Sequence, residues 1–125
     1  MALAEMVGLV VGSRKTGENL KMLIAQWTCE AKFGHKNEVL ALHKEWEEQI
    51  GSQTDIDLSK VRTLTGSVGA KEAIIQSEME IANLAELDAF FDKIASIQMH
   101  ADWGKKFSEV VVSGSTYWAA YRVVD

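Results

Sequence analysis

Hydrophobic and polar residues alternate along the middle of the chain. In residues 71–83 one side carries Ala73, Ile75, Ser77, Met79 and Ile81, and the other carries Ile74, Gln76, Glu78 and Glu80. A period of two residues predicts a β-strand. Residues 59–70 are rich in Thr and Val, and the corner at Gly69, Ala70 and Lys71 joins them to this strand. The two stretches together predict an antiparallel hairpin.

The two ends of the chain also predict strands. In residues 110–125, VVVSGSTYWAAYRVVD, one side carries Tyr117, Ala119, Tyr121 and Val123, and the other carries Trp118, Ala120, Arg122 and Val124. Large side chains on both faces predict that the protein's own helices cover one face and another molecule covers the other. Residues 5–15 form a β-branched run with Gly8 and Gly12 on one face, which leaves room for a ligand or a second backbone.

The period changes to that of a helix in three other regions. Apolar residues in 16–34 predict one helix and those in 35–51 a second, or the two regions form one long bent helix. Residues 83–97 predict a strongly amphipathic helix, with Asn83 and Glu86 spaced as a capping box. A shorter helix is expected in HADWGKKFSEVV, residues 100–111. The apolar stripes of the three regions are Leu20, Leu23, Ile24, Trp27 and Ala31; Val39, Leu42, Trp46 and Ile50; and Leu84, Leu87, Phe90, Phe91 and Ile94.

This order of elements predicts an α+β fold in which helices pack on one face of an antiparallel sheet. A chain of 125 residues is expected to form a single domain, residues 1–125. The net charge of −5 and the absence of any basic run longer than two residues disfavour nucleic-acid binding. One cysteine allows no internal disulfide, and the apolar stretch 6–11 is too short to span a membrane and has no basic leader. A cytoplasmic protein is expected.

Two stretches carry a resemblance to a known family. EMEIANLAELDAFFDKI (78–94) and HADWGKKFSEVVVSGSTYWAAYRVV (100–124) resemble the second half of the dimeric α+β barrel superfamily, in its NIPSNAP-like and antibiotic-biosynthesis-monooxygenase-like forms. The resemblance implies a ferredoxin-like antiparallel four-stranded sheet with helices on one face, here with an extended first helical region. It also implies a homodimer whose two sheets close a barrel, and a pocket between sheet and helices in each subunit.

The resemblance also indicates candidate site residues. Family cyclases use a histidine near the turn that HADW occupies here, which implies His100 as an acid or base, and Tyr121 is a second candidate for proton transfer. Trp103 stands where a second histidine is frequent. An aromatic cavity would be lined by Trp27, Trp103 and Tyr117, and the alternative for these aromatics is core and dimer packing. Gly8, Gly12 and Met79 are added as substrate-binding residues if they share one face with Tyr121 under the helices, with Trp27 as a lid.

Other chemistry-bearing residues are interpreted as structural. His43 and Glu47 lie one helical turn apart, which is typical of a solvated helix face, and no further ligands converge on them to form a metal site. Cys29 is expected to be a small buried hydrophobe rather than a nucleophile. We expect neither a metal nor a cofactor.

Three functions fit these features. The first is a small-molecule enzyme of secondary metabolism, a cofactor-free monooxygenase or cyclase that acts on an aromatic or polyketide-like substrate in an apolar pocket. The second is a non-catalytic or stress-related dimeric module that holds a small apolar or aromatic ligand. The third is a haem-binding protein, for which three histidines are present.

Overall fold

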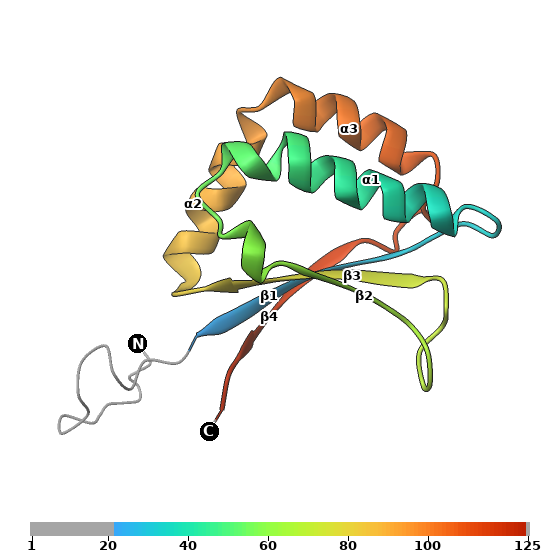
Figure 1. Cartoon of the computed structure of the whole chain (residues 1–125), viewed down its shortest axis with the longest axis horizontal. Helices are drawn as coiled ribbons and strands as arrows, with labels where there is room; N and C mark the ends of the chain where they lie inside the picture. Colours follow the sequence, from blue (N-terminus) through green and yellow to red (C-terminus); the bar gives the residue numbers. More distant parts are fainter. Residues whose placement is uncertain (1–21, 125) are drawn as a thin grey trace, which may run out of the picture.

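The protein is built on one four-stranded antiparallel sheet, seen in a computed structural model that describes residues 22–124 (Figure 1). Its strands are β1 (Leu23–Glu30), β2 (Arg62–Thr65), β3 (Ile74–Ile81) and β4 (Tyr117–Arg122), in the spatial order β2-β3-β1-β4. The first and last strands are therefore neighbours near one edge. The predicted hairpin is confirmed as β2 and β3, and the predicted terminal strand is confirmed as β4.

Three α-helices cover one face of this sheet (Figure 1). They are α1 (Lys36–Gln49), α2 (Leu84–Ala95) and α3 (Gln98–Ser108), and two short 3₁₀ turns, η1 (Gly51–Gln53) and η2 (Leu58–Lys60), connect α1 to β2. The predicted α+β architecture is thus confirmed. None of the helices within residues 22–124 is long and apolar enough to cross a membrane.

The prediction of a helix in residues 16–34 is wrong, because residues 23–30 form β1. Leu23, Ala25, Trp27 and Cys29 fit an alternating pattern as well as a helical one. Pairing decides between the two, since β1 lies between β3 and β4 and bonds to both. The expected extended first helical region is therefore reduced to α1 alone. The strand predicted at 5–15, with Gly8 and Gly12, lies outside the described residues.

The register of the strands defines the two faces of the sheet. Trp27 pairs with Ser77 on one side and with Trp118 on the other, so these three side chains share the face under the helices. Ile24 pairs with Tyr121, which places both on the opposite, open face. The predicted division of the terminal strand is confirmed. Met79 and Tyr121, however, lie on opposite faces, which corrects the expectation that they share one side.

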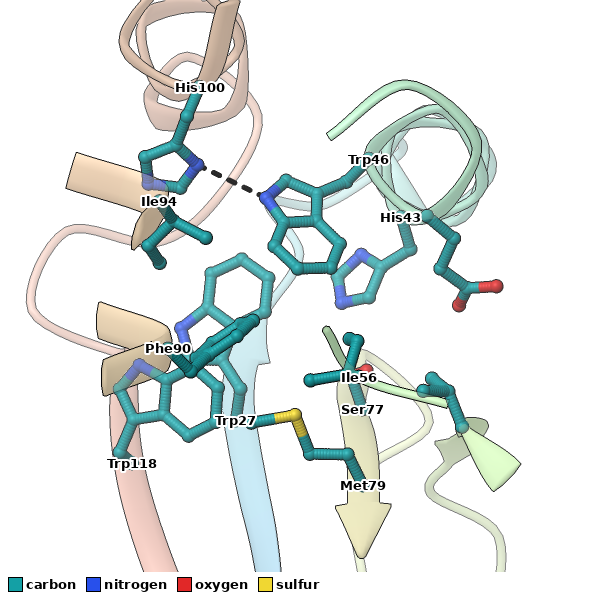
Figure 2. Close-up of a pocket in the computed structure, with 12 residues that line it drawn as sticks. Trp27, His43, Trp46, Ile56, Ser77, Met79, Phe90, Ile94, His100 and Trp118 are labelled. Carbon is teal, nitrogen blue, oxygen red and sulfur yellow. Dashed lines mark hydrogen bonds between the residues drawn. The ribbon is translucent and has the colours of Figure 1, made fainter. Parts of the chain in front are cut away.

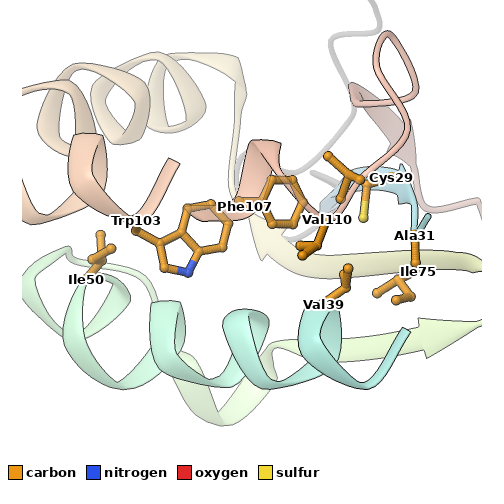
Figure 3. Packing of buried hydrophobic residues seen from close by; sticks show 9 residues of the cluster. Cys29, Ala31, Val39, Ile50, Ile75, Trp103, Phe107 and Val110 are labelled. Atoms are coloured by element: carbon orange, nitrogen blue, oxygen red, sulfur yellow. The ribbon is translucent and has the colours of Figure 1, made fainter. Parts of the chain in front are cut away.

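Two apolar clusters fill the space between helices and sheet. Figure 3 shows the first, and the second lies toward the other end of the sheet. The half-buried side chains of Trp46 and Ile94 pack against both clusters. The first consists of Cys29, Ala31, Val39, Ile50, Ile75, Trp103, Phe107, Val110 and Val111, and the second of Leu23, Ala25, Met79, Ile81 and Phe90. The boundary between the clusters, where Trp46 and Ile94 lie, is the place where a site can open.

The start of α2 confirms the predicted capping box. The Asn83 side chain accepts a hydrogen bond from the Glu86 backbone N–H at 2.9 Å, and the Glu86 carboxylate accepts one from the Ala82 N–H. The start of α1 differs, because its N-cap, His35, makes no side-chain capping bond. α2 therefore has a side-chain capping hydrogen bond at its start, and α1 has none.

This difference gives a first prediction. Asn83→Ala removes the capping acceptor and leaves the Glu86 N–H without its partner, so the free energy of unfolding should fall by about 1 kcal/mol. Asn37→Ala, at an exposed position in the first turn of α1, should change it by less than about 0.5 kcal/mol. Urea unfolding of both variants checks this, and equal losses would contradict the role of the cap.

Candidate functional site

A cavity of about 170 Å³ lies between the helices and the sheet, at the boundary of the two apolar clusters (Figure 2). Its walls come from all four strands or their flanks and from all three helices. The lining residues are Trp27, His43, Trp46, Glu47, Ile56, Val61, Ser77, Met79, Phe90, Ile94, His100 and Trp118. Apolar and aromatic side chains surround a few polar groups, which is the usual composition of a small-molecule site.

The floor of the cavity is one row of residues that crosses the sheet. Thr63, Ser77, Trp27 and Trp118 lie directly opposite one another on successive strands. Ser77 interrupts the apolar series of Ile75, Met79 and Ile81 on this face of β3. Because the side chain of Ser77 is the small member of this series, the sheet has room for a cavity at this point.

Aromatic rings form the walls. The Trp27 and Trp118 rings are stacked with their centroids 6.2 Å apart, and Phe91 meets Trp118 edge-on at 5.2 Å. Phe90 meets Trp46 edge-on at 6.0 Å. These rings come from β1, β4, α1 and α2, so the tertiary fold, rather than any local motif, brings them together.

His43 is the buried polar group of this cavity. Its side chain extends from α1 into the space beside Trp46 and Trp27 (Figure 2), and the residue is only 4% exposed. The imidazole ring stacks on Trp27, with the two ring centroids 5.2 Å apart. The Nδ1 atom lies 3.0 Å from the Val39 carbonyl oxygen. A carbonyl oxygen can only accept, so Nδ1 carries the proton and donates a hydrogen bond to the Val39 carbonyl.

The other ring nitrogen of His43 follows from this bond. Burial lowers the pKa of His43, so the imidazole is neutral near pH 7 and its Nε2 atom is an unprotonated acceptor. Nε2 is at the end of the ring away from the α1 backbone. Among the described residues it has no hydrogen-bond partner, although it is fully buried. A buried acceptor without a partner is costly, and such sites ask for an explanation.

Two further ionisable groups line the cavity. His100, at the start of α3, accepts a hydrogen bond at its Nδ1 from the Trp46 indole N–H at 3.1 Å (Figure 2), and burial lowers its pKa. Burial raises the pKa of Glu47, and a hydrogen bond from Thr63 partly offsets that effect. The cavity therefore holds two neutral imidazoles and one carboxyl group of weakened acidity.

The residues expected to form the site divide into four groups. His100, Trp27 and Met79 line the cavity together. Trp103 lies behind the cavity, 2% exposed in the first cluster, and its indole N–H donates to the Leu42 carbonyl at 2.8 Å. Tyr117 and Tyr121 lie on the open face of the sheet, away from this cavity. Gly8 and Gly12 lie outside the described residues.

The interpretation of His43 as part of a solvated helix face is wrong. His43 follows Val39 by four residues and has Leu42 and Trp46 beside it, so the helical period already places it within the apolar stripe. That position in the sequence already indicated that His43 is buried. Ser77, which breaks the apolar series of β3, was a second sequence signal, in this case for the cavity.

Two other interpretations can be compared with the structure. Cys29 is buried in the first cluster, which confirms the expected packing position, and burial raises the pKa of its thiol to about 11, which disfavours a thiolate near neutral pH. Within residues 22–124 no group of three or more His, Cys, Asp or Glu side chains is arranged to hold a metal ion.

Comparison with known proteins places the fold in a class. No known family profile and no curated protein matches this sequence. The structure is similar to a NIPSNAP family protein from Agrobacterium tumefaciens, with 19% identity, a TM-score of 0.66 and coverage of 83% of this chain and 94% of that one. A dimeric protein of unknown function with a ferredoxin-like fold, from Bacteroides fragilis, matches with 17% identity, a TM-score of 0.58 and coverage of 82% and 96%.

A third similar structure is a candidate antibiotic biosynthesis monooxygenase from Caulobacter crescentus, with 8% identity, a TM-score of 0.57 and coverage of 85% of this chain and 92% of that one. The chain therefore has a ferredoxin-like α+β fold, and the resemblance carried by residues 78–94 and 100–124 is confirmed at the level of fold. Identities this low show only that the folds are similar, so any chemistry has to be inferred from the residues of the cavity.

The burial of His43 predicts a pH dependence of stability. The unfolded chain takes up a proton near the ordinary histidine pKa of about 6.5, and the folded protein takes it up only at lower pH, so the free energy of unfolding falls as the pH drops below about 6.5. His100 adds to this trend, and Glu47, whose pKa burial raises, opposes it. Comparison with a variant isolates the contribution of His43.

Urea unfolding at about pH 7.5 and pH 5.5 tests this prediction. Wild-type protein should lose more unfolding free energy on acidification than the His43→Gln variant. Ala41→Gln, on the exposed side of the same helix, should keep the wild-type dependence. Equal losses in the wild type and in His43→Gln would mean that His43 is not buried in its neutral form.

Proposed function

We propose that the cavity binds a small aromatic compound that carries a hydroxyl group, and that His43 accepts the hydroxyl proton. The observation that carries this proposal is the buried, unprotonated and unpartnered Nε2 atom of His43. A ligand hydroxyl that donates to Nε2 removes the cost of burying an acceptor without a partner. The apolar walls supply the affinity, and this hydrogen bond supplies the orientation.

The size of the cavity indicates the size of the ligand. A cavity of about 150 Å³ lined by apolar side chains is known to hold one benzene ring, and this cavity measures about 170 Å³. A single aromatic ring therefore fits, and a fused polyketide would have to extend beyond the cavity. A haem macrocycle is several times larger than one benzene ring, so the size also favours a small aromatic compound over haem.

Proton transfer to His43 would activate such a compound. A phenol that loses its proton to Nε2 becomes an electron-rich phenolate, and the stacked ring of Trp27 would orient it. Molecular oxygen could then add to the ring without a cofactor. One oxygen atom would remain on the ring as a carbonyl, the other would leave as water, and that water would carry off two hydrogens of the phenol. The product would be a quinone.

The similar structures support this reaction type. The Caulobacter crescentus protein is a candidate antibiotic biosynthesis monooxygenase, and so is a protein from Chloroflexus aurantiacus with a TM-score of 0.52 and 9% identity. These names belong to those proteins, and they favour oxygenation over cyclisation for this one. A small-ligand binding module without turnover uses the same cavity and the same hydrogen bond, and it is separated from the enzyme by experiment.

The proposed base gives a prediction for His43→Gln. The glutamine amide oxygen can still accept a hydrogen bond but cannot take up a proton near neutral pH. Phenol binding should therefore change by less than about fivefold, and oxygen uptake with the phenols that the wild type oxidises should fall by about 10²- to 10⁴-fold. Calorimetry and an oxygen electrode measure the two quantities. Lys44→Gln is the matched control and should behave as wild type.

The outcomes separate the two classes of function. Phenol binding without oxygen uptake in the wild type would favour the binding module. Oxygen uptake that survives in His43→Gln would remove His43 as the base. Failure of any single-ring phenol to bind to the wild type would contradict the proposal as a whole.

We also propose that the open face of the sheet pairs with a second copy of the chain. Tyr117 and Tyr121 are 55% and 56% exposed on that face, and Ile24, Leu64 and Ile74 are half-buried on the same face. The dimeric Bacteroides fragilis protein with the same fold supports this arrangement. Exposed aromatic side chains on one continuous face are typical of an interface.

Sedimentation at micromolar concentration tests the dimer. The wild type should sediment at twice the chain mass of 13.8 kDa. Tyr121→Glu would place a charge on the open face and should shift the population to monomer. Phe33→Glu, at a fully exposed position in the turn before α1, should leave the dimer intact. A wild-type monomer, or a dimer unaffected by Tyr121→Glu, would contradict this interface.

A further inference from the structure

The two histidines of the cavity have opposite hydrogen-bonding character. The indole N–H of Trp46 can only donate, so the Nδ1 atom of His100, which lies 3.1 Å from it, is unprotonated. Burial lowers the pKa of His100, so the ring is neutral near pH 7 and its single proton is on Nε2. In His43 the Val39 carbonyl holds the proton on Nδ1 and leaves Nε2 as an acceptor.

The fold fixes both proton positions through partners within the protein. Val39 is completely buried one turn before His43 on α1, and Trp46 is on the same helix and reaches across to α3 (Figure 2). Neither partner can reverse its role, since a carbonyl has no proton and an indole nitrogen has no available lone pair. Both rings line the cavity, so its walls include one imidazole whose Nε2 accepts and one whose Nε2 donates.

We propose that the ligand is a single-ring compound with both a hydroxyl group and a conjugated carbonyl group. The hydroxyl donates to His43 Nε2, and the carbonyl accepts from His100 Nε2–H. This inference rests on the proposed function, since it assumes that the cavity is the binding site, and it adds the second polar group of the substrate. A compound with only one of the two groups leaves one imidazole without its bond.

The two hydrogen bonds together also affect the reactivity of the ligand. When a hydroxyl conjugated with a carbonyl loses its proton to His43, the negative charge spreads onto the carbonyl oxygen. The hydrogen bond from His100 then becomes charge-assisted and stronger. His100 would therefore stabilise the anion more than the neutral ligand, which favours proton transfer to His43.

Calorimetry with matched probes tests the proposal. The 3- and 4-hydroxyacetophenones carry both groups, the 3- and 4-ethylphenols keep the shape and the hydroxyl, and acetophenone keeps only the carbonyl. One of the hydroxyacetophenones should bind to the wild type about five- to tenfold more tightly than the ethylphenol of the same substitution and than acetophenone. His100→Phe should abolish this preference and leave ethylphenol binding unchanged within about twofold. Met99→Ala, at an exposed neighbouring position on α3, is the control and should retain the preference.

Nitrogen-15 NMR of the histidine rings reads the proton positions directly and does not depend on any ligand. We expect the proton of His43 on Nδ1 and that of His100 on Nε2 at about pH 7.5. Trp46→Phe removes the donor to His100, so the proton of His100 should distribute over both ring nitrogens. The proton of His43 should stay on Nδ1.

The results distinguish this inference from the function it rests on. If the ethylphenols bind as tightly as the hydroxyacetophenones, or if His100 carries its proton on Nδ1, the two-group ligand is wrong and the phenol site remains. If His100→Phe weakens ethylphenol and hydroxyacetophenone equally, His100 only shapes the cavity. If no phenol binds to the wild type, both proposals fail.

Discussion

The hydrogen bond from His43 Nδ1 to the Val39 carbonyl is the contact on which the proposed site depends. It lies within one helix and needs no ligand, yet it fixes which ring nitrogen carries the proton and leaves Nε2 as an acceptor. Without it, either ring nitrogen could carry the proton, and the buried imidazole would have no defined role. With it, the helix presents a neutral acceptor against the ring of Trp27, and the sheet and the other helices enclose that acceptor in apolar surroundings.

The cavity exists because the two apolar clusters meet imperfectly. Ser77 takes a position on β3 where its neighbours on the same face are Ile75 and Met79, and the aromatic rings of Trp27 and Trp118 extend the floor across two further strands. Trp46 and Ile94 touch both clusters and roof the gap. A larger apolar side chain at 77 would fill the space and join the clusters. The fold therefore gives up some packing at one row of the sheet, which is where a site is possible.

Local patterns were sufficient for α1 and for the second half of the chain, and they were insufficient for residues 16–34. The strand of Met79 and the cap at Asn83 depend on neighbours in sequence, so alternation and spacing predicted them correctly. Residues 23–30 fit both periods, and only pairing with β3 and β4 makes them a strand. The apolar stripe of α1 contained the signal for the burial of His43. The site around His43 also depends on the Trp27 and Phe107 rings, which are distant in the sequence, so local patterns do not reveal it. Which face of β4 meets the helices likewise depends on α2, whose Phe91 packs on Trp118.

The proposed binding of an aromatic hydroxyl compound depends on His43 Nε2 as its polar anchor. A crystal structure of the protein soaked with phenol would show whether this anchor is used. We expect the phenol ring beside Trp27 and its oxygen within about 3 Å of His43 Nε2, at hydrogen-bonding distance. Phenol bound in the cavity with its oxygen directed toward Ser77 or Glu47, and His43 Nε2 in contact with water instead, would contradict it.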